Sequence, residues 1–197
     1  MLDWIKNIGG NYPDFWKDYL SKFDKKSNRF VVLNIETSGL DKEKDKILSI
    51  GAIAVVNNSI IVADSFEISF AKENSINFDH PKETEHEEKI SEALNLQSIE
   101  SFIVYIGNAV LVGHRTAFEV NILNEYLEKL KCGRLKNEAL DIEVMYKKLE
   151  DIIDKQFSLD ELITKFKIEK SERYSVSENA FSIAILFLKL KSRLKIL

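Results

Sequence analysis

Residues 31–40 read VVLNIETSGL and are the most informative stretch of this chain. The first half of the stretch is apolar apart from Asn34, a pattern typical of a strand buried on both faces. Glu36 stands where this apolar run stops, and Gly39 marks a turn directly after it. The stretch therefore predicts a buried β-strand that ends in an acidic turn.

Length and composition indicate one globular domain. The chain has 197 residues, of which 45% are hydrophobic and 30% charged, and this is enough for a stable core without structural metal. The net charge of -4 argues against a basic protein that coats nucleic acid, although it leaves a local basic groove open. Cys132 is the single cysteine, which excludes a disulfide framework and a zinc cluster.

Two further patterns concern location. Residues 1–6 lack the apolar segment of a secretory signal peptide. No stretch reaches the roughly 18 apolar residues that a membrane helix needs. We therefore expect a cytoplasmic protein without a membrane partner.

The N-terminal segment predicts a helix of its own. Pro13 is followed by aromatic and apolar residues at helical spacing, which favours one amphipathic helix within residues 11–26, packed on the outside of the domain. We therefore predict a helical extension over residues 1–28 and a larger domain over residues 29–197.

The remaining pattern alternates strands and helices. Strands are expected at residues 29–35, 47–56, 59–70 and 109–113, with a tight turn at residues 57–58. Residues 71–98 are polar and predict an irregular segment that leads into a helix over 98–106. Further helices are expected at about 117–130, 140–150, 158–166 and 174–195. The order predicts an α/β fold, with helices packed on the faces of a sheet.

Three motifs carry a family resemblance. Residues 33–40 (LNIETSGL), 111–119 (LVGHRTAFE) and 173–180 (RYSVSENA) follow one another in the order seen in the DEDDh 3′→5′ exonucleases. That family includes the proofreading ε subunit of DNA polymerase III, and the resemblance covers about residues 29–195. It implies a ribonuclease H-like fold, a mixed sheet of about five strands flanked by helices.

The resemblance also assigns roles, and several assigned positions are altered. Glu36 matches a metal-binding glutamate of the family, and Glu119 stands at the position of an aspartate. Asn34 and Asn179 occupy the positions of two further acids, and Tyr174 that of the general-base histidine. A pair of divalent ions needs several carboxylates, and tyrosine, with an unperturbed pKa of about 10, is a poor base at neutral pH. We therefore predict a site with Glu36 and Glu119 as its remaining ligands and with impaired catalysis.

Other residues have two interpretations. The resemblance implies that Thr37 and Leu40 belong to a turn that touches the terminal nucleotide. His114 is either a nucleic-acid contact or a hydrogen-bonded structural histidine. Glu178 follows Tyr174 at the spacing of the sister DEDDy group and would supply a third acid if it faced the site. Adjacent helical residues point about 100° apart, and the apolar pattern downstream favours Asn179 inward instead.

The sequence leads to three hypotheses about function. The leading hypothesis is a catalytically impaired relative of the exonucleases that retains binding to nucleic acid or protein. The second is a weak but genuine metal-dependent 3′→5′ exonuclease. The third is a protein-interaction module with a vestigial cleft and the N-terminal aromatic helix as its working surface. The expected partners are the 3′ end of single-stranded DNA or RNA, or a protein. The expected cofactor is Mg²⁺ or Mn²⁺ for an active enzyme and none for an inactive one.

Overall fold

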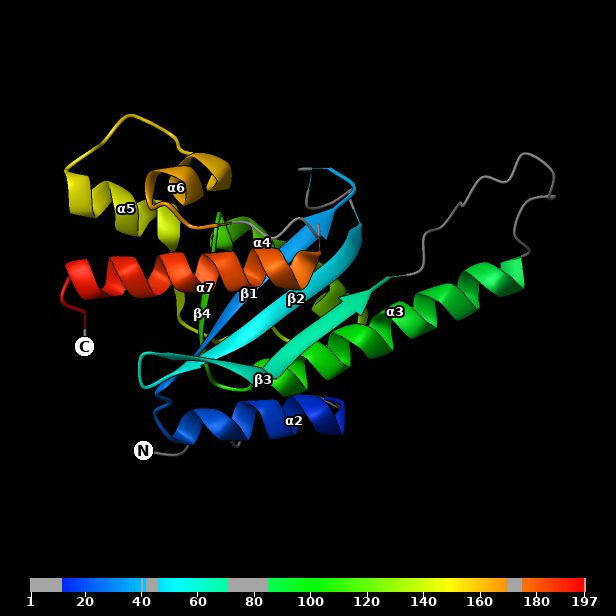
Figure 1. Ribbon diagram of the computed structural model, residues 1–197. Helices are drawn as coiled ribbons and strands as arrows, with labels where there is room; N and C mark the ends of the chain where they lie inside the picture. The colour runs from blue at the N-terminus through cyan, green and yellow to red at the C-terminus, as the bar shows by residue number, and fades with distance from the viewer. Residues whose placement is uncertain (1–11, 40, 42–45, 71–84, 170–174, 197) are drawn as a thin grey trace, which may run out of the picture.

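The sheet has five strands. The structure is a computed structural model that describes residues 12–39, 41, 46–70, 85–169 and 175–196. The strand order is β3-β2-β1-β4-β5. The strands are β1 (Arg29–Thr37), β2 (Ile47–Val56), β3 (Ser59–Ser69), β4 (Val110–Gly113) and β5 (Ala139–Asp141). β1 pairs with β2, and β2 with β3, in antiparallel fashion, whereas β1 with β4 and β4 with β5 are parallel. The sheet is therefore mixed, as predicted (Figure 1).

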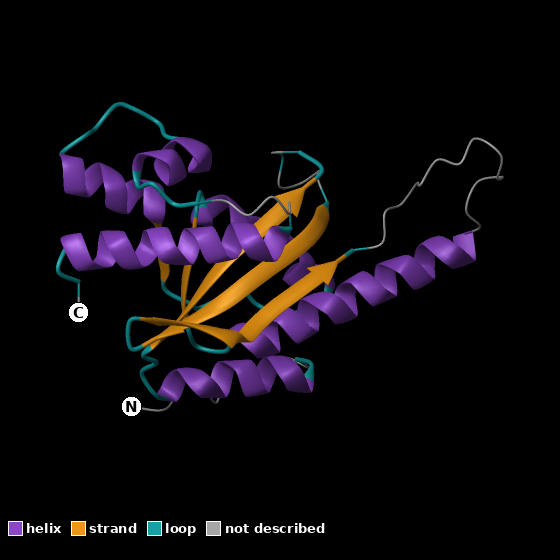
Figure 2. Ribbon diagram, viewed as in Figure 1, coloured by secondary structure: helices purple, strands orange, loops and turns teal. Residues whose placement is uncertain are grey.

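Helices cover both faces of the sheet. One layer contains α5 (Ile142–Glu150), α6 (Leu159–Lys165) and α7 (Val176–Arg193). The other contains α2 (Asp14–Ser21), the short 3₁₀ turn η1 (Lys22–Asp24), α3 (Glu85–Ile106) and α4 (Thr116–Lys129). The alternation of strand side chains explains the two cores, because Val32 packs in the α7 layer while Val31 and Leu33 pack in the α4 layer. This three-layer arrangement confirms the predicted fold (Figure 2).

The antiparallel strands agree closely with the sequence pattern, but two other elements differ. Asn57 and Asn58 have φ values of 51° and 60°, as the predicted tight turn requires. The helix predicted over residues 140–150 is wrong at its start, since β5 occupies Ala139–Asp141 and α5 begins at Ile142. The reason is that Asp141 caps α5, accepting the N–H groups of Glu143 and Val144, while its own strand pairs with β4.

The helix predicted over residues 98–106 is also too short. α3 begins at Glu85, within the segment predicted to be irregular. The charged residues of that segment include good helix formers, so a polar helix is stable once its C-terminal turns pack against the sheet. No helix in the described parts of the chain combines the length and apolar character needed to cross a membrane.

The N-terminal helix packs against the same core as the sheet. Trp16 and Tyr19 are each only 1% exposed and join the core of the α4 layer. The Tyr19 hydroxyl accepts the N–H of Lys136 at 2.8 Å and donates to Asn137 Oδ1 at 2.7 Å. These two aromatic rings are therefore not available to a partner, which counts against the N-terminal helix as a working surface.

One glycine fixes the position of α7. Gly51 lies opposite Asn34 in the pairing of β2 with β1. A Cβ atom at residue 51 would lie closer than 3.0 Å to backbone atoms of Val176 and Ser177, in the first turn of α7. α7 thus begins directly on the backbone of β2, beside the end of β1.

We predict that Gly51→Ala destabilises the protein by about 2 kcal/mol or more, because the added methyl meets backbone that can move only if α7 moves. Urea unfolding monitored by circular dichroism measures this loss. Gly133→Ala is the matched control, since its Cβ would meet the nearest atom, Trp16 Cζ2, at an ordinary 3.6 Å. An equal effect of the two substitutions would contradict the prediction.

Candidate functional site

The first motif lies at the end of β1. Asn34 and Glu36 alternate along the strand with Ile35, so both side chains face the α7 layer together with Val32. Glu36 is exposed. Its Oε2 accepts a hydrogen bond of 2.5 Å from the hydroxyl of Ser49, the residue opposite on β2. Glu36 is therefore a solvent-facing acid held in place by a buried serine.

The third motif begins beside the first. Ser175 caps α7 by accepting the N–H of Glu178 at 3.2 Å. The following turn lies on Gly51, the cross-strand neighbour of Asn34. Asn179 is half-buried in this first part of α7 and precedes the buried Ile183 by one helical turn. The fold thus brings the predicted first and third motifs together, with asparagine at both altered positions.

Glu119 is placed differently from an open metal ligand. It belongs to the first turn of α4, and only 4% of it is exposed. Its Oε1 accepts the N–H of Ile35 at 3.1 Å, so the side chain reaches the backbone of β1. Its Oε2 is buried and accepts no hydrogen bond within the described residues. The carboxyl group of Glu119 is therefore directed into the protein.

A second glycine makes this burial feasible. A Cβ atom at residue 113, the last residue of β4, would overlap Glu119 Oε2 at well under 3.0 Å. The carboxyl group therefore fills the space that Gly113 leaves without a side chain. Burial is the main cause that raises the pKa of Glu119 well above its usual value; the charge of Asp141 adds to the rise, and the Ile35 N–H opposes it. The environment favours the neutral acid.

These positions do not fit the pair of divalent ions that the resemblance implies. Such a pair requires several charged oxygen atoms facing one open cleft. Asn34 and Asn179 carry no charge, and Glu119 is buried in a setting that favours its protonated form. Within the described ranges, no group of three or more histidine, cysteine, aspartate or glutamate side chains is arranged to hold a metal. Among the described acid positions of the motifs, Glu36 alone is an exposed carboxylate.

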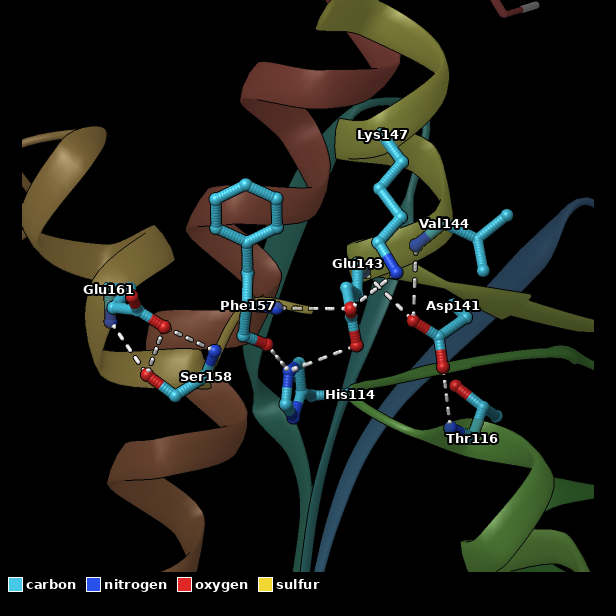
Figure 3. A network of polar contacts seen from close by, with 9 residues as sticks. All are labelled: His114, Thr116, Asp141, Glu143, Val144, Lys147, Phe157, Ser158 and Glu161. Atoms are coloured by element: carbon cyan, nitrogen blue, oxygen red, sulfur yellow. Dashed lines mark hydrogen bonds and ion pairs between the residues drawn. The ribbon is translucent and has the colours of Figure 1, made fainter. Parts of the chain in front are cut away.

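His114 is tied to the loop before α6. Its Nε2 lies 2.8 Å from the carbonyl oxygen of Phe157 and 3.9 Å from Glu143 Oε2 (Figure 3). Glu143 in turn accepts the N–H of Phe157 at 3.1 Å and the ammonium of Lys147 at 2.8 Å. Burial acts to raise the pKa of Glu143, but the bonds from Lys147 and Phe157 together hold it below its usual value. His114 therefore has the contacts of a structural histidine, and nucleic-acid contact stays a prediction.

Asp141 connects three elements next to His114 and Glu143, although it was not among the predicted site residues. Its Oδ2 accepts the N–H of Thr116 at 2.9 Å, and its Oδ1 accepts the N–H of Glu143 at 2.8 Å. One carboxylate thus joins the ends of β5, α4 and α5 (Figure 3). The signal in the sequence was an aspartate directly before an amphipathic helical pattern, which is typical of an N-cap.

The structure describes some of the other predicted residues and leaves two outside the described ranges. Glu178 lines a hollow above β2 and β3, and the residues that line this hollow include neither Asn34, Glu36 nor Glu119. The hydroxyl of Thr37 donates to the carbonyl of Gly39 at 2.5 Å, within the turn after β1. Leu40 and Tyr174 lie outside the described residues, so their roles stay predictions.

The raised pKa of Glu119 predicts a pH dependence. The folded protein binds the proton of Glu119 more tightly than the unfolded chain does, so the contribution of Glu119 to wild-type stability falls as the pH rises above the ordinary value of 4.5. In Glu119→Gln the side chain keeps nearly the same shape but does not titrate. The free energy of unfolding of this variant, relative to wild type, should therefore increase between pH 4.5 and 8.

Urea titrations across this pH range measure the difference. Glu128→Gln, on the exposed side of the same helix, is the control. Equal pH profiles for Glu119→Gln and wild type would show that folding does not raise the pKa of Glu119.

Comparison with known proteins agrees with the fold. Residues 31–178 match the model of the exonuclease family RNase_T. The PolC-type DNA polymerase III of Caldanaerobacter subterraneus is 29% identical over 169 residues, which cover 84% of this chain and 12% of that protein. The chain therefore spans only a small part of the curated relatives it matches.

Solved structures show the same fold. A zinc-bound complex of E. coli exonuclease I with single-stranded DNA has a TM-score of 0.64 and 14% identity, covering 85% of this chain and 41% of that one. An ExoI/SSB-Ct complex has a TM-score of 0.59 and 13% identity, covering 85% and 42%. With three ordered motifs, a matching sheet and a family model that spans most of its length, the chain belongs to the exonuclease family.

Proposed function

We propose that this chain is a catalytically impaired exonuclease domain that retains the strand-end cleft as a binding site. The observation that carries the proposal is the inward burial of Glu119, whose carboxyl group is hydrogen-bonded to the backbone of β1. In this arrangement the carboxyl group is not presented to an ion in an open cleft, and it would have to give up its hydrogen bond with Ile35 to ligate one.

The charge balance supports the same conclusion. The family arrangement uses four acids, and two of those positions are asparagine here. If Glu119 is neutral as well, Glu36 is the single charged ligand left against two doubly charged ions. Loss of one residue that merely supports a metal ligand typically costs about 10–100-fold in metal affinity or activity, and the loss of several ligands costs more.

The ligand we propose is the 3′ end of a single DNA strand. The relatives are DNA polymerases, and exonuclease I, which shares the fold, forms a complex with single-stranded DNA. The proposed contacts are Thr37 and Leu40 in the turn after β1, with His114 at the end of β4. A cleft with fewer carboxylates repels the phosphate backbone less, so binding can persist where cleavage is lost.

We predict no digestion of end-labelled single-stranded DNA in Mg²⁺ or Mn²⁺ beyond that of Glu36→Ala, because the ions are not held. The measurement is mononucleotide release on a denaturing gel, with anisotropy of the same oligonucleotide as the binding assay. Metal-dependent release that disappears in Glu36→Ala would establish a genuine exonuclease and refute the impaired site. Absence of any oligonucleotide binding would refute the retained cleft.

Restoring the charges should restore metal affinity. We expect the combined variant Asn34→Asp, Asn179→Asp and Tyr174→His to bind Mn²⁺ at least about tenfold more tightly than wild type, since two charged metal ligands are added to the cleft. Isothermal titration measures the change. The control variant, Asn95→Asp with Gln97→Glu, adds two carboxylates on α3, outside all three motifs. An equal gain in the control would show that the effect is general charge, and the register of the third motif would then be wrong.

A further inference from the structure

The hollow lined by Glu178 lies between α7 and the strands β2 and β3. It has a volume of about 390 Å³, and the described residues that line it come from β2, β3, the segment after α6, and α7: Ala52, Ile53, Val62, Ser65, Glu169, Ser177, Glu178, Phe181 and Ser182. Figure 1 shows α7 running across β2 toward this part of the sheet. The volume is within the range of small-molecule and side-chain pockets.

An irregularity in β3 shapes this hollow. The pairing of β3 with β2 passes from Ile61 opposite Ala54 to Ser65 opposite Ile53, so residues 62–64 have no partner on β2. Such a bulge bends the strand and redirects its side chains. It leaves Val62 67% exposed, although it is apolar. The bulge places an apolar side chain at the rim of the hollow.

Hydrogen bonds from Arg29 and Tyr105 hold the bulge in place. Asp64 accepts hydrogen bonds from Arg29 Nη2 at 3.0 Å and Nε at 3.1 Å, and its carbonyl accepts the hydroxyl of Tyr105 at 2.9 Å. The Arg29 guanidinium also lies over the Tyr105 ring at 4.7 Å. Because these contacts fix the backbone beside Val62, the hollow is formed in advance of any ligand.

The chemistry of the lining is apolar and negative. Phe181 is 39% exposed and faces the hollow together with Val62. Among the described residues, the two charged ones that line it, Glu169 and Glu178, are both acids. None of the described lining residues carries a positive charge, so a charged donor on an apolar stem would complement the hollow.

We propose that this hollow docks a segment of a partner protein in which an arginine or lysine stands next to an apolar residue. The cation would pair with Glu178 and Glu169, while the apolar stem and its neighbour cover Phe181 and Val62. Nucleic acid does not fit, because its phosphates would meet two carboxylates. A second copy seated face to face does not fit either, since it would bring the same acids of both chains together.

The probe is the blocked tripeptide acetyl-Leu-Arg-Leu-amide, with acetyl-Leu-Glu-Leu-amide and the citrulline peptide as charge controls. We expect the arginine peptide to shift the amide resonances of residues 62–65 and 177–182 in ¹⁵N spectra of the whole chain, with a millimolar dissociation constant. Glu178→Gln should weaken binding about tenfold through loss of the charged acceptor. Val62→Ser should weaken it severalfold through loss of apolar contact. Ile153→Ser, at an 84% exposed position outside the lining, is the matched control and should leave it unchanged.

Four outcomes would overturn the proposal. The first is no response to the arginine peptide at several millimolar, and the second is binding of the glutamate or citrulline peptide as tight as that of the arginine peptide. The third is unchanged affinity for the arginine peptide in both Glu178→Gln and Val62→Ser, and the fourth is equally tight binding of spermidine. The last would assign the hollow to a free polyamine. Self-association that Val62→Ser abolishes in sedimentation would assign it to a second copy. Because none of these readouts involves cleavage or DNA, the result is independent of the proposed impaired site.

Discussion

The carboxyl group of Glu119 occupies a space between β1 and β4 that exists because residue 113 has no side chain. This one contact links the second motif to the first through the N–H of Ile35. Burying a carboxyl group favours its neutral form. The side chain that satisfies an N–H of β1 is therefore also an acid whose charge this burial opposes.

The sheet brings the elements that carry the motifs together at the C-terminal end of β1. β1 lies between an antiparallel partner, β2, and a parallel one, β4, and it supplies Asn34 and Glu36 on the face covered by α7. Gly51 allows the first turn of α7 to reach the same edge. Asp141 fixes the neighbouring starts of α4 and α5. Small residues and one capping carboxylate thus determine how closely the motif-bearing elements approach each other.

α7 separates two surfaces of different chemistry. Asn179 lies on the stripe that leads to the buried Ile183, whereas Glu178, one residue earlier, shares the hollow above β2 and β3 with Phe181 and Ser182. The difference in direction follows from the helix itself, since adjacent residues point about 100° apart. The spacing of Tyr174 and Glu178 in the sequence therefore does not by itself bring Glu178 to the cleft.

The sequence alone determined the fold, and the altered motif positions remain a prediction from it. Apolar runs predicted β1, β2 and β4, and the pair Asn57–Asn58 predicted the turn before β3, because these signals are local. It missed β5, since three residues carry too little pattern to distinguish a strand from the start of the helix that follows. The direction of the Glu119 carboxyl group and the position of Glu178 were decided only by tertiary structure. The carboxyl group of Glu119 bonds to Ile35, far away in the chain, and Glu178 lies near β2 and β3. Local sequence pattern does not encode such long-range contacts.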